Sequence, residues 1–275
     1  MVDFHIYEVG PRDGLQNTDV NVPTGAKIDL VRRLEGIGFS GIEVASFVHP
    51  KWVPHMADAE QVFVGVGKKH SVLVPNERGM QRALDAGATH FNIFYSPSEV
   101  FNKRNLAIDR KTAVGEYRKM LYGIPKENIR VYLSCFFGCP EEGPLGEDLL
   151  RECVQEAALL GDTVVLCDTV GMATLQDIAI ASNFKHEIYG DLALHLHHEE
   201  GDEERALTLV SEAIAYGITT IDSSIGGLGG CPFMPESGGN LATESLVAWA
   251  VDNGLDCGVS LLALSPAFEW LDEHL

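Results

Sequence analysis

Basic side chains are scarce in this chain, which has 20 Lys and Arg against 40 Asp and Glu and a formal net charge of −20. A nucleic-acid backbone requires a surplus of positive charge on its partner, and an anionic membrane surface requires the same. The composition therefore argues against nucleic acid and membranes as partners. The acidic excess indicates a solvated, negatively charged surface and says little about chemistry.

The sequence also lacks a run of about 18 apolar residues, and its N-terminus, MVDFHIYEVG, has no basic region or apolar stretch of a secretory signal. These absences predict a cytoplasmic protein. Cysteines are few and scattered, at positions 135, 139, 153, 167, 231 and 257, which excludes a disulfide scaffold. Cys135 and Cys139 form a CxxxC without a second pair, so a structural zinc site is not predicted.

What the chain does contain is a regular alternation of short β-branched runs with stretches of helical periodicity. The predicted strands are 2–9, 41–46, 70–75, 90–95, 128–135, 163–168, 192–197 and 219–225, and the predicted helices include 24–37, 147–160, 202–216 and 240–253. Such alternation predicts parallel strands with right-handed crossovers. Eight units favour a closed (β/α)₈ TIM barrel over an open doubly wound sheet. No linker divides the chain, so we predict one domain over residues 1–275, with 259–275 as a C-terminal extension.

His195 and His197 lie at the end of the seventh predicted strand. Alternation along a strand turns both imidazoles to one face, here the barrel interior, and the active site of such a barrel lies at the carboxyl ends of its strands. The pair either binds a metal or consists of two buried histidines bonded to carboxylates. Two imidazoles rarely suffice for a cation, so an oxygen ligand should approach from a neighbouring strand end.

Asp13 meets that requirement, because only the eighth strand separates the first strand from the seventh in a closed barrel. Asn240, at the start of the last predicted helix, is a candidate for a further ligand. Two imidazoles with carboxylate and amide oxygens suit a divalent cation. Mg²⁺ and Mn²⁺ are the preferred ions, with Co²⁺ and Zn²⁺ as alternatives.

Arg12 can stabilise a carboxylate or a developing enolate oxygen at this strand end, or form a salt bridge to Glu43 or Asp168, or do both. We expect Gln16, Glu43 and Asp168 to contact the substrate or to orient the groups that do. The glycine-rich loop 226–239 can hinge over the site and bring Cys231 inward, where its thiol would relay a proton. A phosphate-cradling loop and a plain flexible connection are the alternatives for that segment.

Several ordered blocks together resemble the 3-hydroxy-3-methylglutaryl-CoA lyase family. They are EVGPRDGLQN (8–17), IEVASFVHPKWVP (42–54), NIF (92–94), SEVFNKRN (98–105), LSCFFGCPEEG (133–143), CDTVGMAT (167–174), HLH (195–197) and GGLGGCP with SGGNLATE (226–244). The resemblance extends from the first predicted strand to the last predicted helix, nearly the whole chain.

This resemblance implies a (β/α)₈ barrel that cleaves 3-hydroxy-3-methylglutaryl-CoA to acetyl-CoA and acetoacetate, as in leucine catabolism and ketone-body formation. It implies a cation on Asp13, His195, His197 and Asn240. It also implies that Arg12 stabilises the enolate of acetyl-CoA and that Cys231 assists proton transfer. His195 is a second candidate proton carrier, and one residue can hardly be both a rigid ligand and a mobile base. Barrels of this type often form dimers, so a homodimer is expected by analogy.

The segment 198–202 departs from the family, which usually continues Asp-Thr-Tyr-Gly-Gln after the histidine pair, whereas this chain has His-Glu-Glu-Gly-Asp. An acidic cluster beside the site would repel an anionic substrate unless it is paired. This departure leaves open a catalytically inactive barrel that only binds a ligand. A longer-branched 3-hydroxy-3-alkylglutaryl-CoA is an alternative substrate. Related barrels that act on 2-oxo acids share the same ligand pattern, so an aldolase or synthase is a further alternative.

Overall fold

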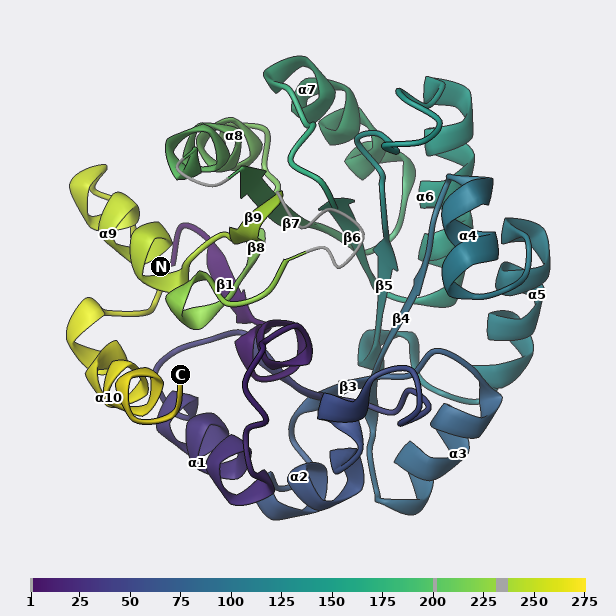
Figure 1. The fold of residues 1–275 in the computed structure, drawn as a ribbon. Coiled ribbons are helices and arrows are strands. Elements are labelled where there is room, and N and C mark those ends of the chain that lie inside the picture. The colour runs from purple at the N-terminus through teal and green to yellow at the C-terminus, as the bar shows by residue number, and fades with distance from the viewer. Residues whose placement is uncertain (1, 200–201, 231–236) are drawn as a thin grey trace.

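A closed ring of parallel strands forms the centre of the molecule in a computed structural model that describes residues 2–199, 202–230 and 237–275 (Figure 1). The ring consists of β1 (His5–Glu8), β2 (Gly41–Ser46), β3 (Ser71–Leu73), β4 (His90–Tyr95), β5 (Ile129–Leu133), β6 (Thr163–Asp168), β7 (Asp191–Glu199) and β8 (Thr220–Ser223). Each strand pairs in parallel with the next one in the chain, and β8 pairs with β1. The predicted TIM barrel is confirmed.

The strand predictions agree with β2, β4 and β6 residue for residue. Four strands are shorter than predicted: the first, third, fifth and eighth, at His5–Glu8, Ser71–Leu73, Ile129–Leu133 and Thr220–Ser223. The seventh is longer and continues to Glu199. Residue propensity predicts a strand over the whole of each apolar run. Hydrogen-bonded pairing with the neighbouring strands decides how much of that run is strand in the structure.

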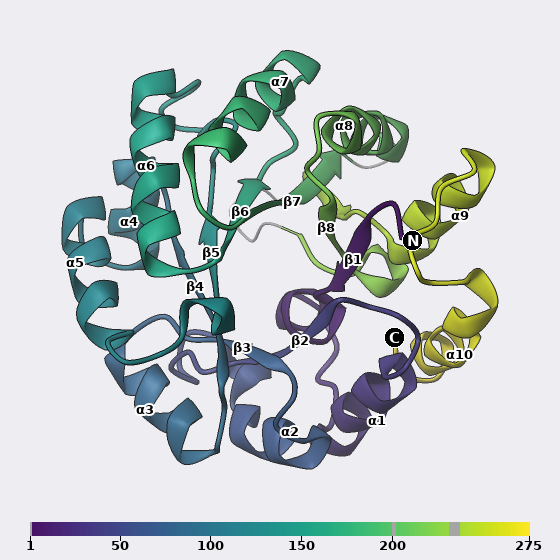
Figure 2. The same ribbon diagram turned by 180° about the vertical axis from the view of Figure 1, so that it is seen from behind.

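Helices surround the strand ring in both views (Figures 1 and 2). They are α1 (Thr24–Leu34), α2 (Ala59–Val66), α3 (Glu77–Asp85), α4 (Glu99–Asn105), α5 (Arg110–Met120), α6 (Glu147–Leu160), α7 (Leu175–Phe184), α8 (Glu203–Ala215), α9 (Thr243–Asp252) and α10 (Ser265–His274). The prediction for α6 is confirmed at both ends. The predicted helix 24–37 is too long, because the backbone is extended at Glu35, with a ψ of 139°, and left-handed at Gly36, with a φ of 77°. Among the described residues, no helix is long and apolar enough to cross a membrane.

Residues 259–275, predicted as an extension, pack as part of the outer layer. Helix α10 lies beside α1 in Figure 1. The side chain of Trp270 is fully buried, and its indole N–H donates to the carbonyl of Ala26 at 2.8 Å. Residues 259–275 therefore cover a face of α1 that would otherwise be exposed to solvent.

Two short elements shape the mouth of the barrel. The strand β9 (Ser237–Asn240) pairs antiparallel with the part of β7 that extends beyond the ring. The π-helical turn η1 (Gly10–Gly14) follows β1 directly. A Cβ at Gly14 would lie 2.7 Å from the Cβ of Leu228, so this turn approaches the segment after β8 as closely as only glycine permits.

Candidate metal centre and active site

His195 and His197 face each other at the end of β7, as the alternation of that strand predicts. Both are buried, and their Nε2 atoms lie 3.1 Å apart. The carboxylate of Asp13 joins them from η1, with its Oδ2 atom 4.0 Å from His195 Nε2. One potential ligand atom from each of these three residues lies within 4.8 Å of the others. The three residues thus form a compact cluster that could hold a metal ion.

Hydrogen bonding fixes His197 in the form that a metal requires. Its Nδ1 lies 3.0 Å from the carbonyl oxygen of Thr169. A carbonyl only accepts, so Nδ1 carries the proton and the lone pair of Nε2 points into the cluster. Burial and the neighbouring His195 lower the pKa of His197 to about 4. The imidazole is therefore neutral at neutral pH and ready to bind a cation.

Asp13 is held as an anion. Although burial opposes ionisation, the adjacent Arg12 guanidinium lowers the pKa of Asp13 to about 2. The backbone N–H of Asp13 donates to the carbonyl of Val9 at 2.7 Å, which fixes the turn that carries the side chain. A charged oxygen ligand is thus available over the whole physiological range.

Asn240 lies next to this carboxylate, but on β9 and not at the start of a helix as predicted. The glycine-rich sequence before it pairs with the free edge of β7, in a register that sets Asn240 opposite His197. Its Nδ2 donates to Asp13 Oδ2 and to the carbonyl of Leu228, each at 2.8 Å. Its Oδ1 is buried without a hydrogen-bond partner in the described part of the chain. That free amide oxygen, two imidazole nitrogens and a carboxylate are a donor set that fits a divalent cation.

Arg12 is buried between two carboxylates. Its Nε donates to Glu43 Oε2 at 2.6 Å, and its Nη1 forms an ion pair with Asp13. The predicted salt bridge to Glu43 or Asp168 is confirmed, and its partner is Glu43. The carboxylate of Asp168 accepts instead from the backbone N–H groups of Met172 and Ala173, at 2.7 and 2.9 Å. It closes the loop after β6, and that loop supplies the carbonyl that orients His197.

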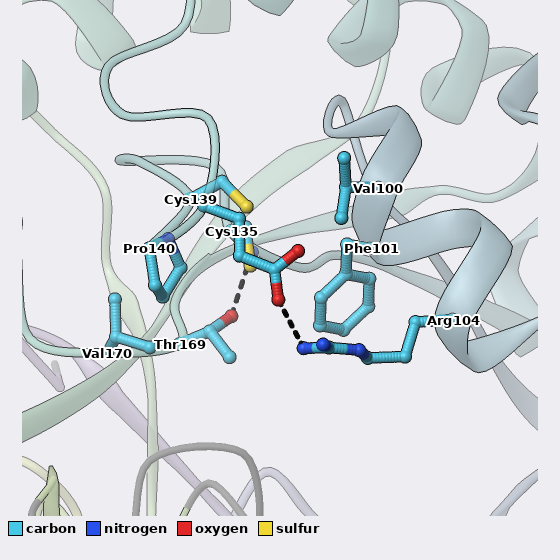
Figure 3. Close-up of a pocket in the computed structure, with 9 residues that line it drawn as sticks. Val100, Phe101, Arg104, Cys135, Cys139, Pro140, Thr169 and Val170 are labelled. Carbon is cyan, nitrogen blue, oxygen red and sulfur yellow. Dashed lines mark hydrogen bonds and ion pairs between the residues drawn. The ribbon is translucent and has the colours of Figure 1, made fainter.

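A cavity of about 780 Å³, measured with its open mouth, lies over the cluster. Arg12, Asp13, His195, His197 and Gln16 line it, whereas Glu43 and Asp168 are not among its lining residues. A smaller cavity of about 410 Å³ adjoins it, and the two share Phe101 and Thr169. Figure 3 shows this second cavity, where Arg104 pairs with Glu141 and the backbone N–H of Cys135 donates to the Thr169 hydroxyl.

Sequence reasoning missed several residues that build the site. Asp222 on β8 faces His195, Arg130 on β5 reaches across the barrel to Asp222, and Tyr132 lines the main cavity. No short motif marks them. A charged residue in the middle of a predicted barrel strand, as Arg130 and Asp222 both are, was an available signal, because such a side chain must find a partner inside the ring. The predicted proton carrier Cys231 lies outside the described residues, as do Glu200 and Gly201 of the altered segment.

Fold and site together define a (β/α)₈-barrel enzyme with a candidate divalent-cation centre at the mouth of the barrel. The family described as HMGL-like matches residues 3–269. A cytoplasmic 3-hydroxy-3-methylglutaryl-CoA lyase of Rattus norvegicus is 38% identical over 275 residues, which cover 97% of this chain and 79% of that protein. The hydroxymethylglutaryl-CoA lyase YngG of Bacillus subtilis is 37% identical over 98% of this chain and 92% of its own. The chain belongs to the HMGL-like family.

A solved structure gives the same result in three dimensions. It is an HMG-CoA lyase from Acinetobacter baumannii in complex with coenzyme A and 3-methylmalate. The two chains superpose with a TM-score of 0.91 at 34% identity, over 98% of this chain and 90% of the other. The resemblance stated from the sequence motifs is confirmed.

Proposed function

We propose that this protein is a divalent-metal-dependent carbon–carbon lyase that cleaves 3-hydroxy-3-methylglutaryl-CoA to acetyl-CoA and acetoacetate. The observation that carries the proposal is the meeting of Asp13, His195 and His197 beside Arg12 in one cavity of an HMGL-like barrel. The names of the curated relatives and the coenzyme A in the solved relative support an acyl-CoA as substrate.

Asp13, His195, His197 and Asn240 would hold the cation, with Mg²⁺ or Mn²⁺ as the expected ion. A bound divalent cation supplies Lewis-acid chemistry, which makes a hydroxyl proton easier to remove. The charge balance favours such an ion. Two carboxylates, those of Asp13 and Glu43, pair with the single positive charge of Arg12, so an added cation relieves an excess of negative charge.

Arg12 is proposed to stabilise the enolate oxygen of the leaving acetyl-CoA. When the bond between C2 and C3 breaks, its electron pair passes to the thioester carbonyl, and the former alcohol carbon becomes the ketone of acetoacetate. A guanidinium already fixed by Glu43 meets that developing charge without reorienting. Glu43 is therefore proposed to orient Arg12, Gln16 to contact the substrate, and Asp168 to hold the loop that positions His197.

Two protons must move in this reaction, one from the tertiary hydroxyl and one to the carbanion of the acetyl group. His195 is buried between the cluster and Asp222. Such confinement suits a fixed ligand better than a mobile base. We therefore propose Cys231 of the glycine-rich loop as the proton carrier and His195 chiefly as a ligand.

The test is an assay of purified protein reconstituted with Mg²⁺ or Mn²⁺, supplied with 3-hydroxy-3-methylglutaryl-CoA and followed by acetoacetate release. We expect turnover that chelation abolishes and that the added ion restores. A longer-branched 3-hydroxy-3-alkylglutaryl-CoA and a hydroxylated 2-oxo acid without CoA form the comparison arms. Cleavage of either one in place of 3-hydroxy-3-methylglutaryl-CoA would overturn the named substrate, and no turnover of any of them would support a barrel that only binds.

A cytoplasmic location and a homodimer complete the proposal. The cytoplasmic names of several relatives support the first, and analogy with other barrels supports the second. Fractionation of the source cells checks the location. Light scattering of the purified protein checks the dimer, and a monomeric mass would contradict it.

A further inference from the structure

Asp222 lies inside the barrel directly behind the candidate metal centre. It comes from β8, in register with His195 on the neighbouring β7, and it is 2% exposed. One carboxylate oxygen, Oδ1, accepts from Arg130 Nη2 at 2.5 Å. The other, Oδ2, faces His195 Nδ1 at 3.5 Å. The carboxylate therefore bridges a buried arginine and a predicted ligand.

The two ring nitrogens of His195 face different surroundings. Nε2 points to His197 Nε2 and Asp13, whereas Nδ1 points away from the cluster to Asp222. A neutral imidazole can bind a cation through Nε2 only if the proton sits on Nδ1, and a buried N–H requires an acceptor. In the described part of the chain neither His195 Nδ1 nor Asp222 Oδ2 has a hydrogen-bond partner. A shift of a few tenths of an ångström brings these two atoms within hydrogen-bond distance.

Arg130 keeps Asp222 available as an acceptor. A carboxylate buried this deeply requires a charge partner, and Arg130 supplies it. Arg130 crosses the barrel from β5 and stacks on the ring of Tyr7, with its guanidinium carbon 3.6 Å from the ring centre. The guanidinium is thus held in place, and it holds one oxygen of Asp222 while leaving the other for His195.

We propose that Asp222, held by Arg130, is a positioning residue that fixes the tautomer and ring orientation of His195 for cation binding; this inference rests on the proposed function. For His197 the backbone carbonyl of Thr169 fixes the tautomer and the ring orientation, and a side-chain substitution does not remove that acceptor. The two ligands therefore have unequal supports, and only that of His195 depends on a side chain. Loss of such a support weakens metal binding about ten- to a hundredfold.

The test compares Mn²⁺ affinity by calorimetry in the wild-type protein and in the double variant Asp222→Leu/Arg130→Met, which leaves no unpaired buried charge. Its matched control is Arg110→Met/Glu156→Leu, which removes a buried arginine's ion pair between α5 and α6. We expect Mn²⁺ binding to weaken at least tenfold in the first variant and to change less than twofold in the control. A folded first variant that binds Mn²⁺ as the wild type does would overturn the role of Asp222.

A second measurement does not depend on whether the Asp222→Leu/Arg130→Met variant folds. In metal-free wild-type protein labelled with ¹⁵N-histidine, long-range proton–nitrogen spectra at pH 8 report which nitrogen of His195 is protonated, and a His195→Gln variant assigns the signal. We expect the proton on Nδ1, and a proton on Nε2 would overturn the inference. If the wild type itself binds no Mn²⁺, the proposed function fails with it. If the wild type binds Mn²⁺ but the double variant binds it equally well, or the proton of His195 is on Nε2, the proposed function stands and only the role of Asp222 is overturned.

Discussion

The two sides of the barrel mouth differ in the polarity of the side chains that line them. On the side of β1, β7, β8 and β9, buried polar groups hold one another through short hydrogen bonds, as Asn240 holds Asp13 at 2.8 Å. On the side of β4, β5 and β6, the adjoining cavity has mostly apolar walls, such as Phe101, Pro140 and Val170, beside the ion pair of Arg104 and Glu141 (Figure 3). The first side fixes charges where chemistry would occur. The second offers mainly apolar surface, which can bind a ligand through contacts with its carbon skeleton.

The largest effect should follow from breaking the polar side at its centre. Asp13→Ala or His197→Ala removes a proposed ligand, so we expect metal content and acetoacetate production to fall together to background. Metal analysis of the purified variants, beside the lyase assay, checks this. A variant that keeps the wild-type metal stoichiometry would remove that residue from the set of ligands.

Arg12→Met should reduce turnover without removing the metal. The variant loses the donor proposed for the enolate, so turnover should fall on the order of a thousandfold while the metal stays bound. Arg104→Met is the matched control, because Arg104 pairs with Glu141 on the apolar side, and we expect only a few-fold change there. If Arg12→Met instead raises KM with kcat unchanged, Arg12 serves substrate binding.

Tyr132→Phe tests where the two sides meet. The hydroxyl of Tyr132 is buried and lacks a hydrogen-bond partner in the described ranges, although the residue lines the main cavity. A buried hydroxyl without a partner can form a hydrogen bond with a bound substrate. We expect kcat/KM to fall about tenfold, with the free energy of unfolding unchanged or slightly higher. An unaltered kcat/KM would argue that substrate does not reach this hydroxyl.

The smallest effect concerns stability beneath the polar side. Burial raises the pKa of Glu8 to about 7, above its value in the unfolded chain, so the folded protein keeps a proton that the unfolded chain loses. Stability from this group is therefore full at low pH, declines as the pH rises from about 4.5 to 7, and then levels off. Glu8→Gln should flatten that decline in urea unfolding measured across this range. Equal slopes in both proteins would contradict a raised pKa.

The sequence is sufficient for those residues whose position follows from local order. The His-x-His spacing on a strand predicts that both rings share a face, and the ring order of eight units predicts that β1 lies near β7. Asp13, His195 and His197 therefore follow from the amino-acid sequence alone. Helix α6 is predicted to the residue because its apolar face repeats without interruption.

The residues that sequence reasoning misses or misplaces depend on contacts across the ring. The pattern assigns Asn240 to a helix, because nothing in a glycine-rich segment shows that it will pair with the free edge of β7. The pattern also makes Asp168 a possible partner of Arg12, whereas in the structure its carboxylate accepts from backbone N–H groups of the loop after β6. Such contacts join strands far apart in the chain and carry no local pattern.

The sequence by itself determined the barrel, its family and the cluster of Asp13, His195 and His197, because periodicity and strand order act over short stretches of chain. Only the tertiary structure decided which atoms face the cluster and what holds them there. Closure of the barrel brings Arg130 to Asp222 and Asp222 to His195 across 92 and 27 positions of sequence. Buried charges must be satisfied wherever the fold places them, and that requirement becomes visible only when the ring is closed.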